Sequence, residues 1–395
     1  MTDANEPGAT DSVREPMRSA DAQTDSVREP MRSADAQTDS RVRPKNSLSG
    51  RNIALLITGV VLVIAVAALN LIHVPKVIMR PGPVTNTLGR TNGKPVIEVH
   101  GAKTYPTSGN LDFTTVSMAG GPQYPVSIME WLRAKYLEND AEIYPEDMWF
   151  PKGVTSKQVE QQSTAEMTDS QQTAEVVAMR AAGVTVPETV KVVQLQEGAA
   201  ARGTLRAGDV LTALDGHRIT SLAAVSTVMA KVKAGTSVPV VVKRGSKTLH
   251  LTVPTSAGDG GHAVFGIAIS PAYKFPYDVK VNAGDVGGPS AGTMFTLAIY
   301  DLLTPGALTG GHKVAGTGTM SEDGTVGPIG GIRQKMLGAE RAGAKFFLAP
   351  NSDCNEAKGH VPSGLTVIKI DNFKDALAAV KKVAAGKTTG FTGCR

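Results

Sequence analysis

One stretch near the amino terminus is apolar throughout. No charged residue occurs from Asn52 to Ile72, and these 21 residues, at about 1.5 Å each, make a helix roughly 31 Å long, close to the hydrocarbon thickness of a bilayer. The pattern predicts a transmembrane helix over residues 52–73. A cleaved signal peptide is the main alternative, but the apolar run is long for one and no A-x-A site follows it.

The residues before this stretch have no apolar face. TDSVREPMRSADAQ, from Thr10 to Gln23, recurs from Thr24 to Gln37 and starts again at Thr38. A polar repeat interrupted by proline cannot bury a core, so we predict a disordered tail over residues 1–51. Four Lys or Arg residues lie between positions 41 and 51, whereas basic residues are sparser after the span. The positive-inside rule therefore predicts a single-pass cell-membrane protein with a cytoplasmic amino terminus and an extracytoplasmic remainder.

Beyond the span, the pattern alternates between strand-like and helix-like segments. VIMRPGPVTNTLG and GNLDFTTVSM read as short strands bounded by Pro and Gly, and Thr164 to Gly183 reads as an amphipathic helix. From Val190 to Pro254, strand-like runs enclose one amphipathic helix over 222–232, whose valines and methionine we assign mainly to a local core. We place Trp131 and Trp149 in a core, with a substrate-side surface as the alternative.

Composition limits the classes of function. A chain of 395 residues with 41% hydrophobic content is long enough for two or three cores. Its net charge of +5 comes from scattered Lys and Arg without an aromatic-interleaved basic stripe, which argues against nucleic acid as a partner. Neither H-E-x-x-H nor Cys-x-x-Cys occurs, so we expect no metal and no cofactor. The two cysteines, Cys354 and Cys394, could form a disulfide or remain two thiols.

The segment GGPSAGTMF holds the candidate nucleophile, Ser290, and Lys335 follows 45 positions later in IGGIRQK. A serine hydroxyl needs a base, and a lysine serves as one when desolvation or a nearby cation lowers its pKa. Glycines around Ser290 let a substrate backbone approach, and the N–H groups near Ser290 and Gly288 are candidate donors to an oxyanion. Lys313 is a weaker candidate base because it lies in a Gly-rich turn.

Two other interpretations of this segment compete. Gly288 to Gly292 also satisfies G-x-S-x-G, the nucleophile elbow of α/β-hydrolases, which requires a strand running directly into the serine and a later acid and histidine. Here a loop and Pro289 separate the expected strand from Ser290, and only His312 and His360 follow. The second alternative is a capping serine at a Gly-rich helix start.

The segment from Phe275 to Pro350 resembles the proteolytic domain of the Lon family of serine peptidases. GPSAGTMFTLAIYDLLT is similar to that family's nucleophile helix, and the stretch VAGTGTM to FFLAP is similar to its T-G-E-I, P-I-G-G, K-E-K and A-G-x-K segments. The resemblance implies that Ser290 is the nucleophile, Lys335 the base and Thr317 the residue that positions the lysine. Two features depart from the family: no P-loop occurs, and Gly287 replaces the acidic residue that often precedes the motif, with Asp285 two positions earlier.

The segment from Ala207 to Gly216 carries the pattern A-G-D-V-L-x-x-L-D-G and resembles a PDZ domain of the bacterial protease-associated type. PDZ domains bind an extended peptide as an added strand. FGIAI, Phe265 to Ile269, is the candidate carboxylate-binding loop if the domain is circularly permuted. Residues 77–395 as a whole resemble membrane-anchored, PDZ-containing relatives of Lon, which implies an α+β fold with the PDZ domain inserted. The expected parts are 77–185, packing with the catalytic domain, 186–272, PDZ-like, 273–385, Lon-like and proteolytic, and 386–395, a tail.

The sequence therefore predicts an ATP-independent serine endopeptidase, tethered to a membrane, that cleaves exported or membrane-proximal polypeptides selected by a PDZ domain. The expected partners are polypeptides, the lipid bilayer and, from the likeness to Lon, further copies of the chain in a ring. A non-catalytic, membrane-anchored PDZ adaptor is the alternative function. Intact Ser290, Lys335 and Thr317 favour the enzyme, because a scaffold has no need of all three.

Overall fold

The computed structural model describes residues 49–394, so most of the predicted disordered tail lies outside the described residues. The first element is helix α1 (Gly50–Leu71), which begins two residues before the predicted span. Within the described part of the chain, α1 is the one helix long and apolar enough to cross a bilayer. Its apolar side chains have no protein core to pack against, since none of its residues is buried.

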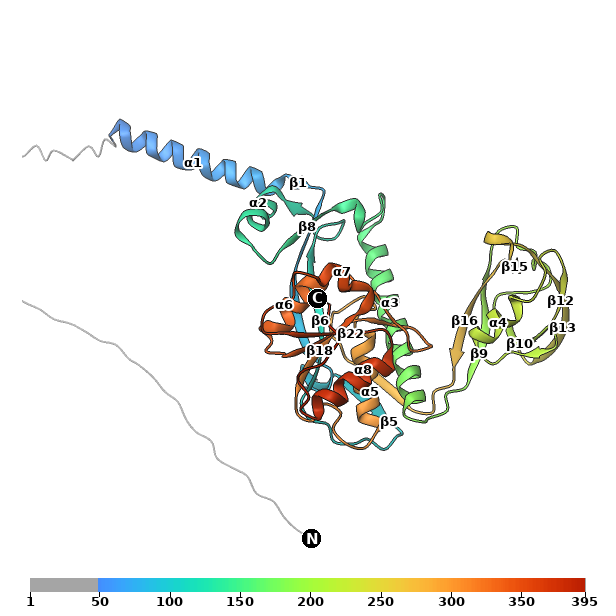
Figure 1. Ribbon diagram of the computed structural model, residues 1–395. Coiled ribbons are helices and arrows are strands. Elements are labelled where there is room, and N and C mark those ends of the chain that lie inside the picture. Colours follow the sequence, from blue (N-terminus) through green and yellow to red (C-terminus); the bar gives the residue numbers. More distant parts are fainter. Residues whose placement is uncertain (1–48, 395) are drawn as a thin grey trace, which may run out of the picture. The chain divides into compact units, whose positions relative to one another are not determined.

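A six-stranded sheet forms the centre of the part of the chain that holds Ser290 and Lys335, in the order β22-β21-β18-β6-β2-β8 (Figure 1). Strand β6 is antiparallel to β2, and β2 to β8, whereas β6, β18, β21 and β22 run parallel. Segments from before and after the PDZ region therefore share one sheet. The six strands are β2 (Lys76–Asn86), β6 (Asn110–Ala119), β8 (Glu142–Pro145), β18 (Lys313–Gly316), β21 (Phe346–Pro350) and β22 (Thr366–Ile370).

Helices cover both faces of this sheet, because alternate side chains of its buried strands point to opposite faces. Phe346 and Leu348 belong to the core formed with α3, α5 and α8, whereas Phe347 and Ala349 belong to the core formed with α6 and α7. Phe113 and Phe295 meet edge to face in the first core, with ring centroids 5.5 Å apart. The five helices are α3 (Ser156–Ala181), α5 (Gly292–Leu303), α6 (Ile332–Arg341), α7 (Cys354–Ala357) and α8 (Phe373–Ala384).

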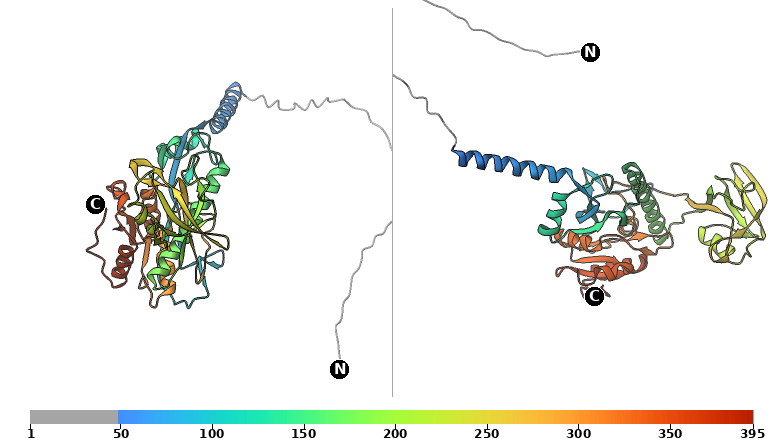
Figure 2. Two further views of the ribbon diagram at one scale, coloured as in Figure 1. Left: turned by 90° about the vertical axis from the view of Figure 1, so that its right-hand side faces the viewer. Right: turned by 90° about the horizontal axis from the view of Figure 1, so that it is seen from above.

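A second sheet forms the PDZ-like domain, in the order β13-β12-β10-β9-β16, with its own apolar core (Figure 2, yellow-green). Strand β16 lies at one edge and contacts α4, whose Val225 and Val228 are buried as expected. The mixed α and β architecture predicted from the sequence is confirmed. The elements of this domain are β9 (Glu188–Leu195), β10 (Val210–Leu214), β11 (His217–Arg218), α4 (Leu222–Met229), β12 (Ser237–Arg244), β13 (Lys247–Pro254), β14 (Ser256–Ala257), η2 (Asp259–Gly261), β15 (Ala263–Val264) and β16 (Ile267–Tyr273).

The carboxyl terminus is attached to the part of the chain that holds Ser290 and Lys335. Cys394 forms a disulfide with Cys354, and the Phe391 ring packs against Phe346. Residues 386–394, expected as a tail, therefore make specific contacts. The remaining elements are β1 (His73–Val74), β3 (Arg90–Thr91), β4 (Lys94–Pro95), β5 (Ile97–His100), β7 (Val126–Ser127), α2 (Ile128–Leu137), η1 (Glu146–Met148), β17 (Asp278–Val281), β19 (Thr319–Met320), β20 (Val326–Gly327) and η3 (Asn351–Asp353).

Candidate active site

Ser290 lies in the turn that leads into α5. The helix begins at Gly292, two residues after the serine; Gly288 has a φ of 81°, outside the helical region, and Pro289 disfavours a helical conformation in the residue before it. The Ser290 carbonyl accepts hydrogen bonds from the Gly318 N–H at 2.8 Å and the Thr317 hydroxyl at 3.0 Å. The backbone of the candidate nucleophile is thereby fixed to the segment that follows β18.

Lys335 lies in the first turn of α6 and is 2% exposed. Burial lowers the pKa of its amine to about 7, against the opposing effect of the carboxylates of Asp353 and Glu356. A large fraction of this amine is neutral near pH 7, as a general base requires. Gly331 precedes the helix, and its φ of 68° favours glycine.

Thr317 connects the two residues. Its fully buried hydroxyl donates to the Ser290 carbonyl and accepts a hydrogen bond from Lys335 Nζ at 3.1 Å. A threonine hydroxyl has one proton, and here it is donated to the Ser290 carbonyl. Toward the Lys335 amine, the hydroxyl can therefore only accept a hydrogen bond. Thr317 therefore restricts the direction in which Lys335 Nζ can present its own lone pair.

Ser290 and Lys335 line the same two cavities. One, of about 270 Å³, also contacts Asp285 and Gly288. The other, of about 500 Å³, is otherwise mostly apolar, with Met79, Val116, Met118, Trp149, Pro328 and Ile329 among its lining residues. Among residues 49–394, no hydrogen bond joins Ser290 Oγ to Lys335 Nζ.

The predicted oxyanion donors differ in availability. The Gly288 N–H donates to the Ser163 carbonyl of α3 at 3.1 Å, so it is occupied in this conformation. The N–H groups of Ser290 and Ala291 have no acceptor among the hydrogen bonds of the described residues. These two N–H groups are therefore unoccupied in this conformation, whereas a bond from Gly288 to a ligand requires its bond to Ser163 to open.

Other sequence candidates lie outside this arrangement. The Lys313 amine donates to the Ala342 carbonyl, and the His312 ring packs edge to face on Phe346. In the described residues, no group of three or more His, Cys, Asp or Glu side chains could hold a metal ion.

One residue of the site was not found from the sequence, and a second was considered there only as an alternative. Asp353 follows β21, and its carboxylate influences Lys335 while accepting a hydrogen bond from the Ile329 N–H at 3.1 Å. Asp353 could have been found from its position after β21, which runs parallel to β18 and lies next to it. The carboxyl ends of parallel strands meet at one edge of a sheet, so residues that follow these two strands lie close together. Trp149, predicted to lie in a core with a substrate-side surface as the alternative, lines the apolar cavity together with Ser290 and Lys335.

Comparison with known proteins identifies both domains. Residues 274–382 match the Lon protease (S16) C-terminal proteolytic domain, and residues 157–255 match the PDZ domain. The chain carries a Lon-type proteolytic domain. The presence of this domain supports the assignment of the protein as a serine peptidase. The PDZ match includes most of α3, although the buried residues of α3 belong to the core of the catalytic part.

Curated relatives match part of this chain. Lon protease of Clostridium beijerinckii is 38% identical over 104 residues, which cover 25% of this chain and 13% of that protein. Lon protease 1 of Bacillus subtilis is 32% identical over 118 residues, covering 28% of this chain and 15% of that protein. The chain thus matches less than a fifth of the length of either relative.

Solved PDZ domains are also similar to a part of the chain. The PDZ domain of the SdrC-like protein from Listeria innocua is 28% identical and covers 20% of this chain and 92% of that chain, with a TM-score of 0.20. The corresponding domain of the SdrC-like protein from Listeria monocytogenes is 25% identical and covers 20% and 85%, also with a TM-score of 0.20. At these TM-scores, the PDZ assignment depends on the family match.

Proposed function

We propose that this chain is a membrane-tethered serine endopeptidase that works without ATP. One observation carries the proposal: Lys335 is buried, its pKa is lowered to about 7, and it is hydrogen-bonded to a threonine that also holds the Ser290 backbone. Burying a lysine without a full ion pair is costly, so a fold retains it where a neutral amine is needed. The Lon-type domain supplies the reaction class.

In the proposed reaction, Ser290 Oγ attacks the carbonyl carbon of a peptide bond. The neutral amine of Lys335 takes the hydroxyl proton and returns it to the leaving nitrogen, which expels the amine and leaves an acyl ester on Ser290. Water, deprotonated by Lys335, then hydrolyses the ester. Thr317 keeps the amine in position, and the N–H groups of Ser290 and Ala291 stabilise the oxyanion.

Two features indicate the class of substrate. The apolar cavity beside Ser290 and Lys335 favours an apolar side chain next to the cleaved bond. In the PDZ-like domain, the edge strand β16 and helix α4 offer the position in which an extended peptide pairs as an additional strand. We propose exported or membrane-proximal polypeptides as substrates, captured by the PDZ domain and cleaved at Ser290, with a ring of copies as the assembly.

Cleavage of an unfolded protein without ATP tests the proposal. We expect Ser290→Ala and Lys335→Met each to reduce the rate by at least about 10³-fold, because nucleophile and base act as one unit. Lys313→Met removes a lysine from the same domain and should retain most of the activity. Circular dichroism checks that every variant folds.

A protein that stays inactive toward several unfolded substrates, and binds peptides equally well with Ser290→Ala, would instead be the PDZ adaptor. Full activity of Lys335→Met would refute the assignment of the base.

A further inference from the structure

Exposed apolar side chains are concentrated in one short region after α1. Beyond Ile72, the large hydrophobic residues that the described structure leaves exposed are Tyr124, Tyr136, Leu137, Met148 and Val193. The first four lie within 25 residues of one another and are 63–79% exposed, whereas Val193 belongs to the PDZ-like domain. We call these four residues the apolar collar. The four residues lie close in sequence, and exposed apolar groups that a fold gathers in one part of its surface mark a contact surface.

The collar is attached directly to the end of the apolar helix. Strand β1, which follows α1, pairs with β7, and the N–H of Ile128 at the start of α2 donates to the Ile72 carbonyl at 2.9 Å. The N–H of Glu146, at the start of η1, donates to the Pro75 carbonyl at 3.2 Å. The segments that carry the collar are therefore held within a few residues of the point where α1 ends.

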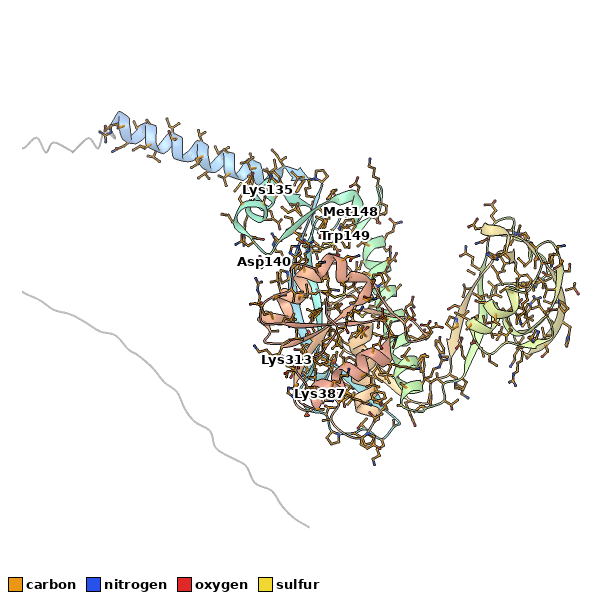
Figure 3. The ribbon with its side chains drawn as sticks, in the orientation of Figure 1. Lys135, Asp140, Met148, Trp149, Lys313 and Lys387 are labelled. Carbon is orange, nitrogen blue, oxygen red and sulfur yellow. A yellow bond between two sulfur atoms is a disulfide. The ribbon has the colours of Figure 1, made fainter. Side chains whose placement is uncertain are left out.

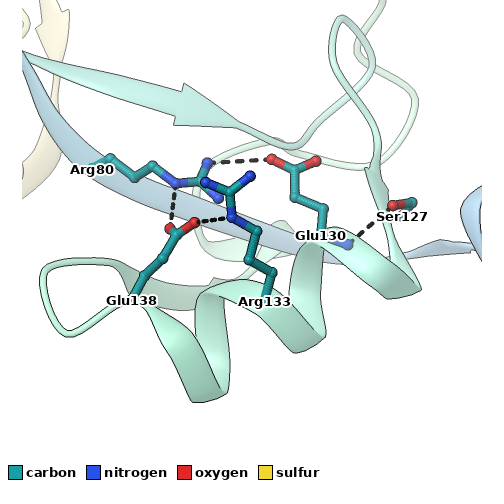
Figure 4. A network of polar contacts seen from close by, with 5 residues as sticks. All are labelled: Arg80, Ser127, Glu130, Arg133 and Glu138. Atoms are coloured by element: carbon teal, nitrogen blue, oxygen red, sulfur yellow. Dashed lines mark hydrogen bonds and ion pairs between the residues drawn. The ribbon is translucent and has the colours of Figure 1, made fainter.

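Ion pairs fix which face of α2 stays uncovered. Arg80 of β2 contacts Glu130 at 3.2 Å and Glu138 at 2.7 Å, and Arg133 also contacts Glu138 (Figure 4). Ala134 is the buried residue of α2. With its charged residues engaged and Ala134 facing the protein, α2 leaves Tyr136 and Leu137 exposed.

The chemistry of the surface fits one partner, the interfacial layer of a bilayer. Tyr and Trp, with Lys beside them, are the residues enriched at the depth of lipid headgroups. Lys135 lies over the rings of Trp131 and Tyr136, with its amine 4.9 and 5.3 Å from their centroids. Lys135 and Met148 are labelled in Figure 3, on the two segments that bond to residues 72–75. A long aliphatic stem with a charged end suits this boundary.

We propose that the apolar collar inserts into the headgroup region of the membrane that α1 spans, so that the catalytic part rests on the lipid surface. This proposal depends on α1 crossing the bilayer, which is part of the proposed function, and not on catalysis. It adds a second contact with the membrane and limits the mobility that a single helical tether leaves.

Tryptophan reporters in the full-length protein test the proposal. The chain has two tryptophans, so Trp131→Phe with Trp149→Phe gives a background without them. Into this background we introduce Leu137→Trp or, as the matched control, Val193→Trp. Each protein is reconstituted in phosphatidylcholine vesicles, with or without bromine atoms on the upper acyl chain. We expect brominated lipid to quench Leu137→Trp emission at least twofold and to leave Val193→Trp within about a tenth of its value.

Two results would overturn the proposal. The first is a Leu137→Trp reporter that brominated lipid does not quench, although resistance to alkaline extraction shows that α1 is inserted. The second is a Leu137→Trp reporter whose burial depends on protein concentration and not on lipid. That result would mean that the collar contacts a second copy of the chain. A protein that is extracted by alkali refutes the span itself. Loss of peptidase activity changes none of these readouts, so the two proposals fail separately.

Discussion

At the scale of single residues, the candidate site depends on the protonation of Lys335. Burial lowers the pKa of the amine to about 7, while the Asp353 and Glu356 carboxylates raise it and so limit the effect of burial. Burial also raises the pKa of Asp353, to about 6, so this carboxyl is largely ionised where Lys335 titrates. The balance between desolvation and these charges sets the pH at which the base is available.

We expect kcat/KM to rise with pH through a midpoint near 7, since Lys335 must lose its proton to act. Asp353→Asn removes a negative charge that favours the protonated amine, so the midpoint should move to lower pH by a fraction of a unit or more. The asparagine can still accept the Ile329 N–H, which protects the fold. A pH profile on a short peptide measures the midpoint.

Asp323→Asn is the control. It changes a carboxylate that accepts a hydrogen bond from the Thr325 N–H, and we expect the midpoint of the pH profile to stay unchanged. An unchanged or higher midpoint for Asp353→Asn would contradict the electrostatic account of Lys335.

At the scale of elements, the start of α6 decides where the lysine lies. Gly331 has a left-handed conformation, and a Cβ at this position would lie 2.7 Å from Val116 Cγ1 of β6. The residue thus allows both the turn into the helix and its close approach to the sheet. Lys335 is one turn further along, so the depth of its amine follows from the placement of this first turn.

Gly331→Ala should lower the free energy of unfolding by about 1–3 kcal/mol and reduce cleavage, because strain and the clash with Val116 displace the first turn of α6. Gly343→Ala is a matched control: its φ is 83°, but nothing lies within 4 Å of the added Cβ. The control should lose about 1 kcal/mol and keep its activity. Urea unfolding and a peptide assay measure both effects, and equal activity of the two variants would contradict this role of Gly331.

At the scale of the whole molecule, one sheet joins segments from both sides of the PDZ region. β6 pairs with β18, although about 200 residues of sequence separate them. The cavity beside Ser290 is lined in part by Trp149, which comes from the segment before the PDZ region. The Cys354–Cys394 disulfide joins the carboxyl terminus to the residue that follows Asp353. A disulfide persists in an oxidising compartment, which agrees with the proposed extracytoplasmic placement.

Removing this disulfide with Cys354→Ser and Cys394→Ser should lower the free energy of unfolding by about 2–4 kcal/mol, because it frees a loop of 40 residues in the unfolded chain. Denaturant titration with and without a reductant measures the effect. The reductant should shift the wild-type midpoint and leave the double variant unchanged. A wild-type protein indifferent to the reductant, with two titratable thiols, would mean that the bond does not form.

Local sequence patterns predicted part of the fold and of the candidate site. The uninterrupted apolar run indicated α1, and Pro and Gly turns marked the segments that form β2 and β6, since both signals depend on residues near one another in sequence. The glycines around Ser290 are also local and led to Ser290 and Lys335 as candidates, whereas Thr317 came only from the resemblance to the Lon proteolytic domain. Their hydrogen-bonded arrangement needed the structure, because Thr317 and Lys335 come from different elements.

By itself, the sequence determined the apolar span, because hydropathy acts over a few residues, and it predicted some of the strands and helices; motifs shared with the Lon family added the three candidate residues. Only the tertiary structure decided the rest: the neighbours of Lys335, the wall that Trp149 contributes, the bond between Gly288 and Ser163, and the pairing of the cysteines. These features depend on which strands lie side by side and how closely helices approach them, and no local pattern encodes such contacts between distant segments.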